Sequence, residues 1–262
     1  MSDSINHVHS NFGGECSRQD LSPYVVLPTD ASHVEMLVKN WQNAKKITHH
    51  YEFLIYTGEY NGVRLSACSV GLSGVPTATA IEELSRLGAH TFMHVGFADP
   101  VIGEMKMGEL VISTGAVRMD GTSLGYVRPE FPSLAHFENV MATISSAQNR
   151  GLSYQVATVC SFASYDLLRA NRTINPEIQR SLDELANAGV YGGTGVEAVI
   201  FVQSALYGLR AGSISVSPID QETQSVNPSV IENALLTSAD AITLLAKWDC
   251  EKSRTNKPYI LP

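Results

Sequence analysis

The sequence predicts an α/β protein built around a largely parallel central sheet, and three observations support this. Short apolar runs alternate with longer helical stretches, a pattern typical of parallel strands connected by helices. The 262 residues are 44% hydrophobic and 17% charged, which is typical of a globular chain with a substantial core. The sequence contains no low-complexity linker and no internal repeat, so nothing in it marks a domain boundary.

The first elements predicted are a strand at 24–27 and a helix at 31–41. A hairpin follows, with strands at 52–56 and 63–70. Asn61 and Gly62 lie between these strands, and this dipeptide is a strong signal for a two-residue hairpin turn.

The remaining elements continue the alternation. A helix is expected at 76–87, since Pro76 would lie in its first turn, where a missing N–H costs nothing. The later elements are strands at 91–95, 110–114, 155–159 and 212–217, and helices at 134–149, 178–188, 195–207 and 231–248. The tail 257–262 contains two prolines and is expected to lack a regular element.

Charge and composition exclude several classes of partner. The formal net charge is −8 and no basic cluster is longer than Lys45-Lys46, so nucleic acid and anionic membrane surfaces are not expected to bind. No apolar run approaches the ~20 residues needed to cross a bilayer, and the first residues resemble no signal peptide. The four cysteines are scattered without metal-ligand spacing. We therefore expect a cytoplasmic protein without a metal or other cofactor.

Four segments together resemble the nucleoside phosphorylase superfamily: residues 25–37, 68–96, 108–138 and 192–216. The run RMDGTSLGYVRPEFPSLAHFE at 118–138 is similar specifically to uridine phosphorylases. The resemblance implies a single-domain, three-layer α/β/α fold with a mixed, partly barrel-like central sheet. This domain is expected over 21–262, after an N-terminal arm at 1–20. The resemblance also implies a homodimer or a hexamer with sites shared between subunits.

Enzymes of this superfamily cleave the ribosyl N-glycosidic bond of a nucleoside while phosphate attacks the ribose. The resemblance implies that Glu197 matches a glutamate that binds ribose hydroxyls, and that a second family glutamate is replaced by Gly195. A carboxylate at a helix start is also explained as a partner of the helix dipole. Val196 lies between these two positions. His7 or His9 corresponds to a family histidine that reaches the neighbouring subunit's ribose, although a polar terminus without regular structure explains both histidines equally well.

The phosphate-binding part departs from the family pattern. Three family arginines correspond to His33, beside Thr29 in the first loop, to Tyr51 and to His94. A guanidinium has a permanent charge and a planar fork that fits phosphate oxygens, whereas tyrosine is neutral and histidine is mostly neutral at pH 7. Asp99 would add a carboxylate that repels phosphate. We therefore expect a degenerate phosphate site.

The base-binding part also differs from uridine phosphorylases. Tyr165 falls where the family places a stacking aromatic side chain, and Phe97 is expected to line the same pocket. Asp220 lies near the position of an acid in purine-acting relatives, although a surface turn explains it equally well. No role is assigned to Arg169 or Arg172.

The leading hypothesis is an enzyme that cleaves a nucleoside-like molecule without phosphate, with Glu197, Asp99 or His94 as general acid or base, because burial can tune the pKa of each group. One alternative is a conventional uridine phosphorylase whose phosphate site uses Arg118 or Arg128. The others are an enzyme recruited to different small-molecule chemistry and a non-catalytic binding protein, because a fold does not fix a function.

Overall fold

A computed structural model describes residues 16–101, 105–163, 176–217 and 227–259. Five residues singled out from the sequence, His9, Tyr165, Arg169, Arg172 and Asp220, lie outside these ranges. Within them, a ten-stranded mixed sheet forms the centre of the molecule. Its strands are β1 (Tyr24–Pro28), β2 (Gln42–His50), β3 (Phe53–Tyr60), β4 (Val63–Cys68), β5 (Thr91–Phe97), β6 (Asp99–Pro100), β7 (Leu110–Met119), β8 (Tyr154–Phe162), β9 (Gly192–Thr194) and β10 (Arg210–Val216).

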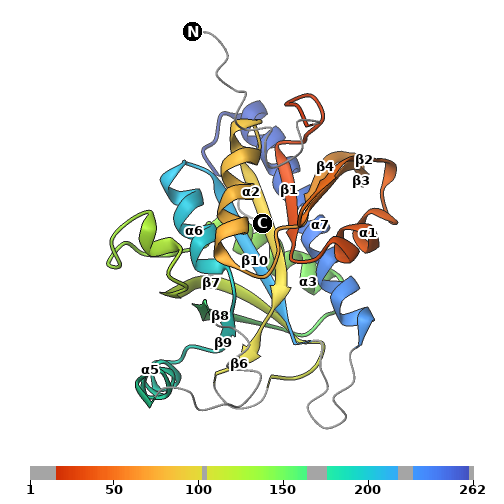
Figure 1. The fold of residues 1–262 in the computed structure, drawn as a ribbon. Helices are drawn as coiled ribbons and strands as arrows, with labels where there is room; N and C mark the ends of the chain where they lie inside the picture. Colours follow the sequence, from red (N-terminus) through yellow and green to blue (C-terminus); the bar gives the residue numbers. More distant parts are fainter. Residues whose placement is uncertain (1–15, 102–104, 164–175, 218–226, 260–262) are drawn as a thin grey trace.

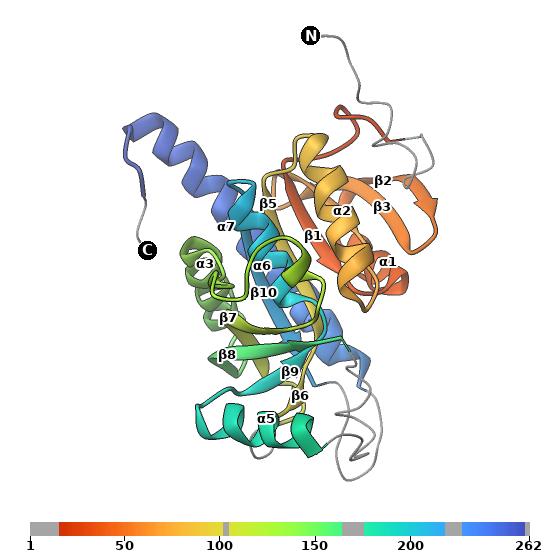
Figure 2. The ribbon, with the colours of Figure 1, turned by 60° about the vertical axis from the view of Figure 1, so that its left-hand side comes forward.

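The sheet curls so that β6, at one end of the strand order, lies close to β5 and β10 in the middle of the order. The strand order is β2-β3-β4-β1-β5-β10-β7-β8-β9-β6, yet β5 and β6 are joined through Ala98 alone. The Ala98 N–H donates to the carbonyl of Val216 in β10 at 3.0 Å. Figure 2 shows β7 and β8 running across the direction of β1 and β5. The mixed, partly barrel-like sheet expected from the sequence is confirmed.

Helices cover both faces of the sheet. They are α1 (Ala31–Val38), α2 (Gly74–Arg86), α3 (Phe137–Asn149), α5 (Pro176–Asn187), α6 (Glu197–Leu206) and α7 (Pro228–Thr255). One buried apolar cluster lies between the sheet and the pair α2 and α6. A second lies between the sheet and α1, α3 and α7. Figure 1 shows α2 and α6 in front of the strands and α3 and α7 behind them, so the α/β/α layering is confirmed.

Helix α7 is long and apolar enough to cross a membrane by length and composition, but 61% of its apolar window is buried inside the fold. It packs against β1, β5, β10 and α3. Asn227 caps its start by accepting a hydrogen bond from Ser229 N, and Pro228 occupies its first turn, where proline is well tolerated. This burial is typical of the core helix of a soluble protein.

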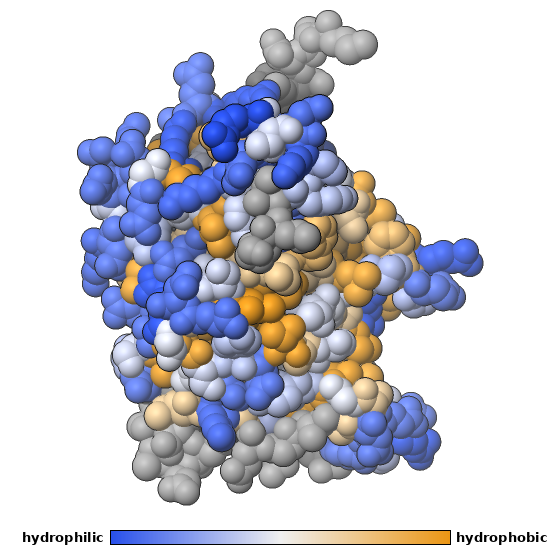
Figure 3. Space-filling model, turned by 180° about the vertical axis from the view of Figure 1, so that it is seen from behind, coloured by the Kyte–Doolittle hydropathy of each residue, from blue (hydrophilic) through white to orange (hydrophobic). Residues whose placement is uncertain are grey.

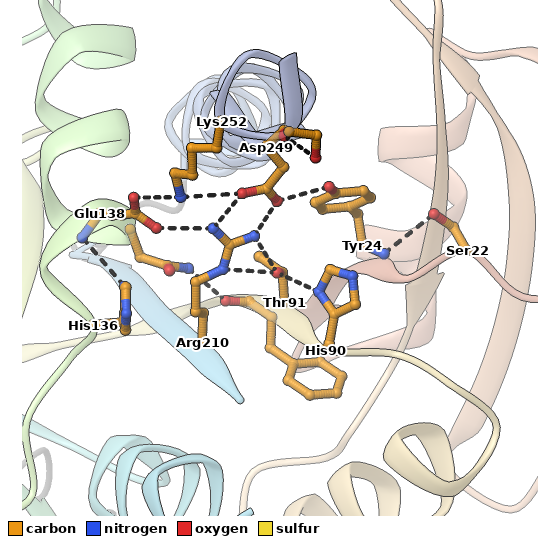
Figure 4. A network of polar contacts seen from close by, with 12 residues as sticks. Ser22, Tyr24, His90, Thr91, His136, Glu138, Arg210, Asp249 and Lys252 are labelled. Carbon is orange, nitrogen blue, oxygen red and sulfur yellow. Dashed lines mark hydrogen bonds and ion pairs between the residues drawn. The ribbon is translucent and has the colours of Figure 1, made fainter. Parts of the chain in front are cut away.

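A polar network attaches the C-terminal part of α7 to the amino ends of the central strands (Figure 4). The Arg210 guanidinium donates to Glu138 Oε2 at 2.8 Å, to Asp249 Oδ1 at 2.9 Å and to Thr91 Oγ1. Tyr24 Oη donates to Asp249 at 2.8 Å. Lys252 pairs with both Glu138 and Asp249. The network therefore joins β1, β5, β10, α3 and α7 at the end of the sheet where these strands begin.

Apolar side chains also reach the surface. Seen from behind, they gather in the middle of the molecule between hydrophilic margins (Figure 3). The large hydrophobic side chains that are most exposed include Tyr51, Leu72 and Val75, which are 73%, 63% and 67% exposed.

Several boundaries differ from those predicted. Strands β2, β6 and β9 were not anticipated, and α7 extends beyond 231–248 at both ends. Helix α3 begins at Phe137 rather than 134, because Leu134 bridges Gly115 and the Ala135 N–H donates to Thr114 as extended chain. Helix α1 ends at Val38 rather than 41, where the N–H of Trp41 turns back to the Val38 carbonyl.

Candidate functional site

The site assembles where β1, β5 and β10 end, beside the first turn of α6. Parallel pairing places Leu27 of β1 and Ser213 of β10 opposite His94 of β5. In open α/β sheets, ligands bind outside the carboxyl ends of parallel strands. Glu197 is the first residue of α6, so its side chain enters this region from the neighbouring layer.

The Glu197 carboxylate is completely buried and accepts three hydrogen bonds. Ser215 Oγ donates to Oε1 at 2.6 Å, and Ser213 Oγ donates to the same oxygen at 3.2 Å. The backbone N–H of Val196 donates to Oε2 at 3.2 Å. The helix N-terminus also favours a negative charge at this position. These contacts hold the carboxylate in one place, and its match to a ribose-binding glutamate stays a prediction.

His94 is buried beside this carboxylate. Its Nδ1 lies 3.1 Å from Ser213 Oγ and 3.7 Å from Glu197 Oε1. Its Nε2 is buried and has no hydrogen-bond partner among the described residues. Burial lowers the pKa of His94 from its usual value of 6.5, and the Glu197 carboxylate offsets only part of that effect. The imidazole is therefore neutral at pH 7.

The absence of a side chain at Gly96 leaves room for the His94 imidazole. A Cβ at Gly96 would lie 2.4 Å from His94 Cε1 and 3.1 Å from Nε2. His94 and Gly96 are two residues apart on β5 and so face the same side of the sheet. The imidazole consequently lies over Gly96, toward the carboxyl end of the strand.

A small cavity lies at this end of the sheet, with about 10 Å³ available to the centre of a water-sized sphere. Its lining consists of Thr29, Leu72, His94, Phe97, Gly195 and Val196. Thr29 Oγ1 is buried and, like His94 Nε2, has no hydrogen-bond partner in the described chain. Leu72 is 63% exposed and forms the outer rim.

The loop before α2 closes the cavity against the start of α6. A Cβ at Gly195 would lie 2.9 Å from the Leu72 carbonyl oxygen, so the observed loop position requires glycine there. Val196 is buried beside it. The position where the family resemblance expects a glutamate is thus filled by the backbone of residue 72.

The residues predicted to form a degenerate phosphate site lie in different surroundings. His33 is packed edge-on against Phe97, with ring centroids 5.6 Å apart. Burial lowers the pKa of His33, and Asp30 offsets part of that shift. Tyr51 lies on the β2–β3 turn, where it is 73% exposed, and its ring contacts that of His50. Thr29, His33 and His94 are thus brought near Phe97 and the cavity, whereas Tyr51 faces outward.

Asp99 is placed apart from this cluster. It lies on β6, where it pairs with Gly193 of β9, and it does not line the cavity. Its role as acid or base stays a prediction, as do the roles of Tyr165, His9 and Asp220. The described residues contain no group of three or more potential metal-ligating side chains.

Ser213, Ser215 and Leu72 were not singled out from the sequence. The signal for the serines was present, because polar residues alternate with Ile214 and Val216 in an otherwise apolar strand. Alternation places both hydroxyls on one face, and that face is the one toward Glu197. Leu72 approaches Gly195 through its backbone carbonyl, and no side-chain type in the sequence indicates such a contact.

Comparison with known proteins identifies the family of the chain. A family model described as the phosphorylase superfamily matches residues 23–223. A uridine phosphorylase from Thermococcus kodakarensis is 35% identical over 246 residues, covering 92% of this chain and 89% of the relative. The Escherichia coli uridine phosphorylase is 29% identical over 77% of this chain and 81% of its own. A guanosine phosphorylase from Halorubrum lacusprofundi is 24% identical over 86% and 95%. The chain belongs to the phosphorylase superfamily.

Proposed function

We propose that this protein is an enzyme that cleaves the N-glycosidic bond of a nucleoside-like small molecule, using water in place of phosphate. The substrate class is supported by relatives that are uridine and guanosine phosphorylases. The absence of phosphate from the reaction is supported by the chemistry of the cavity.

The observation that carries the proposal is that, among the residues the structure describes, no lysine or arginine lines the cavity at His94 and Thr29. Burial lowers the pKa of both His33 and His94, so neither supplies a positive charge at pH 7. Phosphate binding relies on charge-assisted hydrogen bonds from such groups. A cavity of about 10 Å³ also matches one water molecule.

The two arginines considered as substitutes are engaged elsewhere. All five N–H groups of Arg118 are used: Nε donates to Ser123 Oγ, and Nη1 and Nη2 donate to four backbone carbonyls. Arg128 is 81% exposed and pairs with Glu130. Neither arginine lines the cavity.

A second candidate function is phosphorolysis of uridine, which the 35% identity to a uridine phosphorylase favours. It requires a cation to reach the cavity from residues outside the described ranges or from a neighbouring subunit. The two candidates differ in one measurable property, the dependence on phosphate.

The experiment is chromatographic detection of free base from a panel of pyrimidine and purine nucleosides, in phosphate and in a chloride buffer of equal ionic strength. We expect base release in both. Release only with phosphate would establish phosphorolysis and overturn the proposal, and no release would favour recruited chemistry or a binding protein.

A triple variant, His33→Arg, Tyr51→Arg and His94→Arg, provides a converse test. Three fixed positive charges at the predicted phosphate positions should strengthen phosphate binding, measured by calorimetry, relative to the parent chain. Unchanged binding would show that the phosphate positions are wrongly placed.

The proposal also covers the other residues for which the sequence suggested a role in substrate binding. Phe97 and Val196 form an apolar wall for the substrate, and Tyr165, His9 and Asp220 are proposed to contact it. The chain is proposed to form a homodimer or hexamer with shared sites, in the cytoplasm, with no nucleic acid or membrane partner.

A further inference from the structure

The carboxyl ends of β5 and β10 carry a linear series of hydrogen bonds that ends at the cavity. It begins at the buried Glu197 carboxylate, passes through Ser213 Oγ and reaches His94 Nδ1. The far side of the imidazole, Nε2, is buried and has no partner among the described residues. Glu197 from α6, Ser213 from β10 and His94 from β5 are therefore connected one after another by hydrogen bonds. Of these three side chains, only His94 lines the cavity.

The direction of these hydrogen bonds fixes the tautomer of His94. A carboxylate only accepts hydrogen bonds, so the single Ser213 O–H points at Glu197 Oε1, 3.2 Å away. The Ser213 oxygen is then the acceptor toward His94, 3.1 Å from Nδ1, and Nδ1 must carry the proton. Glu197 Oε1, 3.7 Å from Nδ1, favours the same arrangement. In a neutral imidazole, Nε2 consequently has a free lone pair.

Two buried polar atoms face one cavity whose size suits one water. Thr29 Oγ1 and His94 Nε2 both lack a partner in the described chain, and both residues line the space of about 10 Å³. A space of that size holds a single water molecule when polar partners are present. Leaving either polar atom unsatisfied would cost free energy, so a water bound there would stabilise the site.

We propose that His94 is the general base of the hydrolysis, with Nε2 and the Thr29 hydroxyl binding the attacking water, and that Ser213 and Glu197 are positioning residues that hold His94 in its Nδ1–H tautomer. This rests on the proposed function. It assigns Glu197 a role that acts through His94 rather than through the substrate.

The step balances. The water oxygen forms a bond to the anomeric carbon as the bond from that carbon to the base nitrogen breaks, and the departing base keeps the electron pair. One water proton moves to Nε2 of His94, which becomes an imidazolium stabilised through Ser213 by the Glu197 carboxylate. The imidazolium then releases this proton to solvent, and the base nitrogen takes one from solvent. The products are free base and free sugar.

The tautomer is tested directly by NMR on protein labelled with ¹⁵N-histidine, with His94 signals assigned from their loss in His94→Gln. At neutral pH we expect Nδ1 to show a protonated nitrogen shift and Nε2 an unprotonated one. In Ser213→Ala, where the acceptor is lost, the signals should move toward the Nε2–H tautomer. An Nε2–H tautomer in the parent chain would overturn the proposal.

Kinetics provide the second readout. Ser213→Ala should lower kcat about 100-fold, the lower limit of general-base catalysis, with KM changed less than threefold. Thr29→Val should lower kcat about tenfold. The matched control is Ser113→Ala, which removes another buried serine hydroxyl, one with no partner in the described chain, and should change neither kcat nor the His94 signals. Thermal unfolding verifies that each variant is folded, and Glu197→Gln replaces Ser213→Ala if the latter is not.

The two readouts separate this proposal from the proposed function. Hydrolysis by the parent chain that Ser213→Ala leaves unchanged would overturn the role of Ser213 while the nucleosidase activity stands. If the parent chain hydrolyses no nucleoside, the proposed function and the base role of His94 both fall. The NMR signals would still decide whether Ser213 and Glu197 fix the tautomer.

Discussion

Gly96 is the position at which a single added atom would most directly disturb the site. A Cβ there would lie 2.4 Å from His94 Cε1, well inside van der Waals contact, while His94 is completely enclosed by its neighbours. The ring would have to leave Ser213, and its Nε2 would leave the cavity. The absence of a side chain at residue 96 is therefore a requirement of the His94 position.

We expect Gly96→Ala to lower the free energy of unfolding by about 1–3 kcal/mol, the usual range for inserting atoms into a packed core. It should also abolish base release. Gly125→Ala is the matched control, since a Cβ at Gly125 meets nothing within 4 Å, and its unfolding should change little. Urea titrations of both variants measure the difference, and equal stabilities would show that His94 can move freely.

The sequence predicted part of this site at the level of single residues. Thr29, His33, His94 and Glu197 were singled out because their positions match functional positions of a family, and the structure places them around the ends of β1, β5 and α6. Ser213 was not singled out, because a serine in a short apolar strand is chemically unremarkable until its neighbours are known. Its position opposite His94 depends on strand order, which no local pattern encodes.

At the scale of elements, local signals predicted the buried strands and most helices, and failed at β2, β6 and β9. Strand β2 contains mostly polar, exposed side chains, so it shows none of the apolar alternation expected of a half-buried strand. It is held by antiparallel pairing with β3. Strands β6 and β9 have two and three residues and exist only because the sheet curls to bring them together.

The attachment of α7 to the sheet depends on Arg210. Its side chain is 15% exposed, and those of its partners Glu138 and Asp249 are 3% and 26% exposed. Burial raises the pKa of Glu138, but Lys252 and Arg210 together outweigh burial and hold it below 4.5. Burial acts in the same way on Asp249, and Arg210 with Tyr24 and Lys252 outweighs it, so its pKa is held below 3.8.

We expect Arg210→Met to lower the free energy of unfolding by about 3 kcal/mol, because the buried Glu138 carboxylate and the half-buried Asp249 carboxylate would keep only Lys252 as a cation. Both carboxylates have folded-state pKa values below their unfolded values. Their contribution is therefore fully present above about pH 4.5 and is lost as the pH falls through the folded-state pKa values. Urea unfolding between pH 7 and pH 3 should show a smaller acid-induced loss in Arg210→Met than in the parent.

The control for this prediction is Arg128→Met. Arg128 and Glu130 form a pair whose side chains are 81% and 74% exposed, and such surface pairs contribute little. Its unfolding curve should match that of the parent chain at every pH. A parent-like pH dependence in Arg210→Met would show that the network does not couple folding to the ionisation of Glu138 and Asp249.

For the whole molecule, the sequence predicted the architecture more completely than the chemistry. The layers, the mixed sheet and its partial closure follow from apolar patterning and from a family resemblance that spans nearly the whole chain. The chemistry of the site depends on a few residues within that frame. An arginine-to-histidine replacement at a buried position, which the family resemblance implies for His94, would change the charge of the cavity within the same fold.

At the scale of the whole molecule, exposed apolar side chains favour the proposed assembly of several copies of the chain. Tyr51, Leu72 and Val75 are large, apolar and more than 60% exposed. The segments that carry them are neighbours, because a Cβ at Gly71 would lie 3.6 Å from Pro76 and 3.8 Å from Glu52. Leu72 also forms the rim of the cavity. A second copy that covers these side chains would bury them beside the site, which is the arrangement proposed for shared sites.

We expect Val75→Glu to raise the dissociation constant of the proposed homodimer or hexamer at least tenfold, because burying an unpaired carboxylate costs more than about 1.4 kcal/mol. Activity per chain should fall with it, since each site would lose its neighbour. Light scattering across a dilution series measures the assembly, and base release measures the activity. Met107→Glu, at a side chain that is 40% exposed on the loop before β7, is the control. If Val75→Glu dissociates the assembly but leaves the activity per chain unchanged, each subunit contains a complete site of its own.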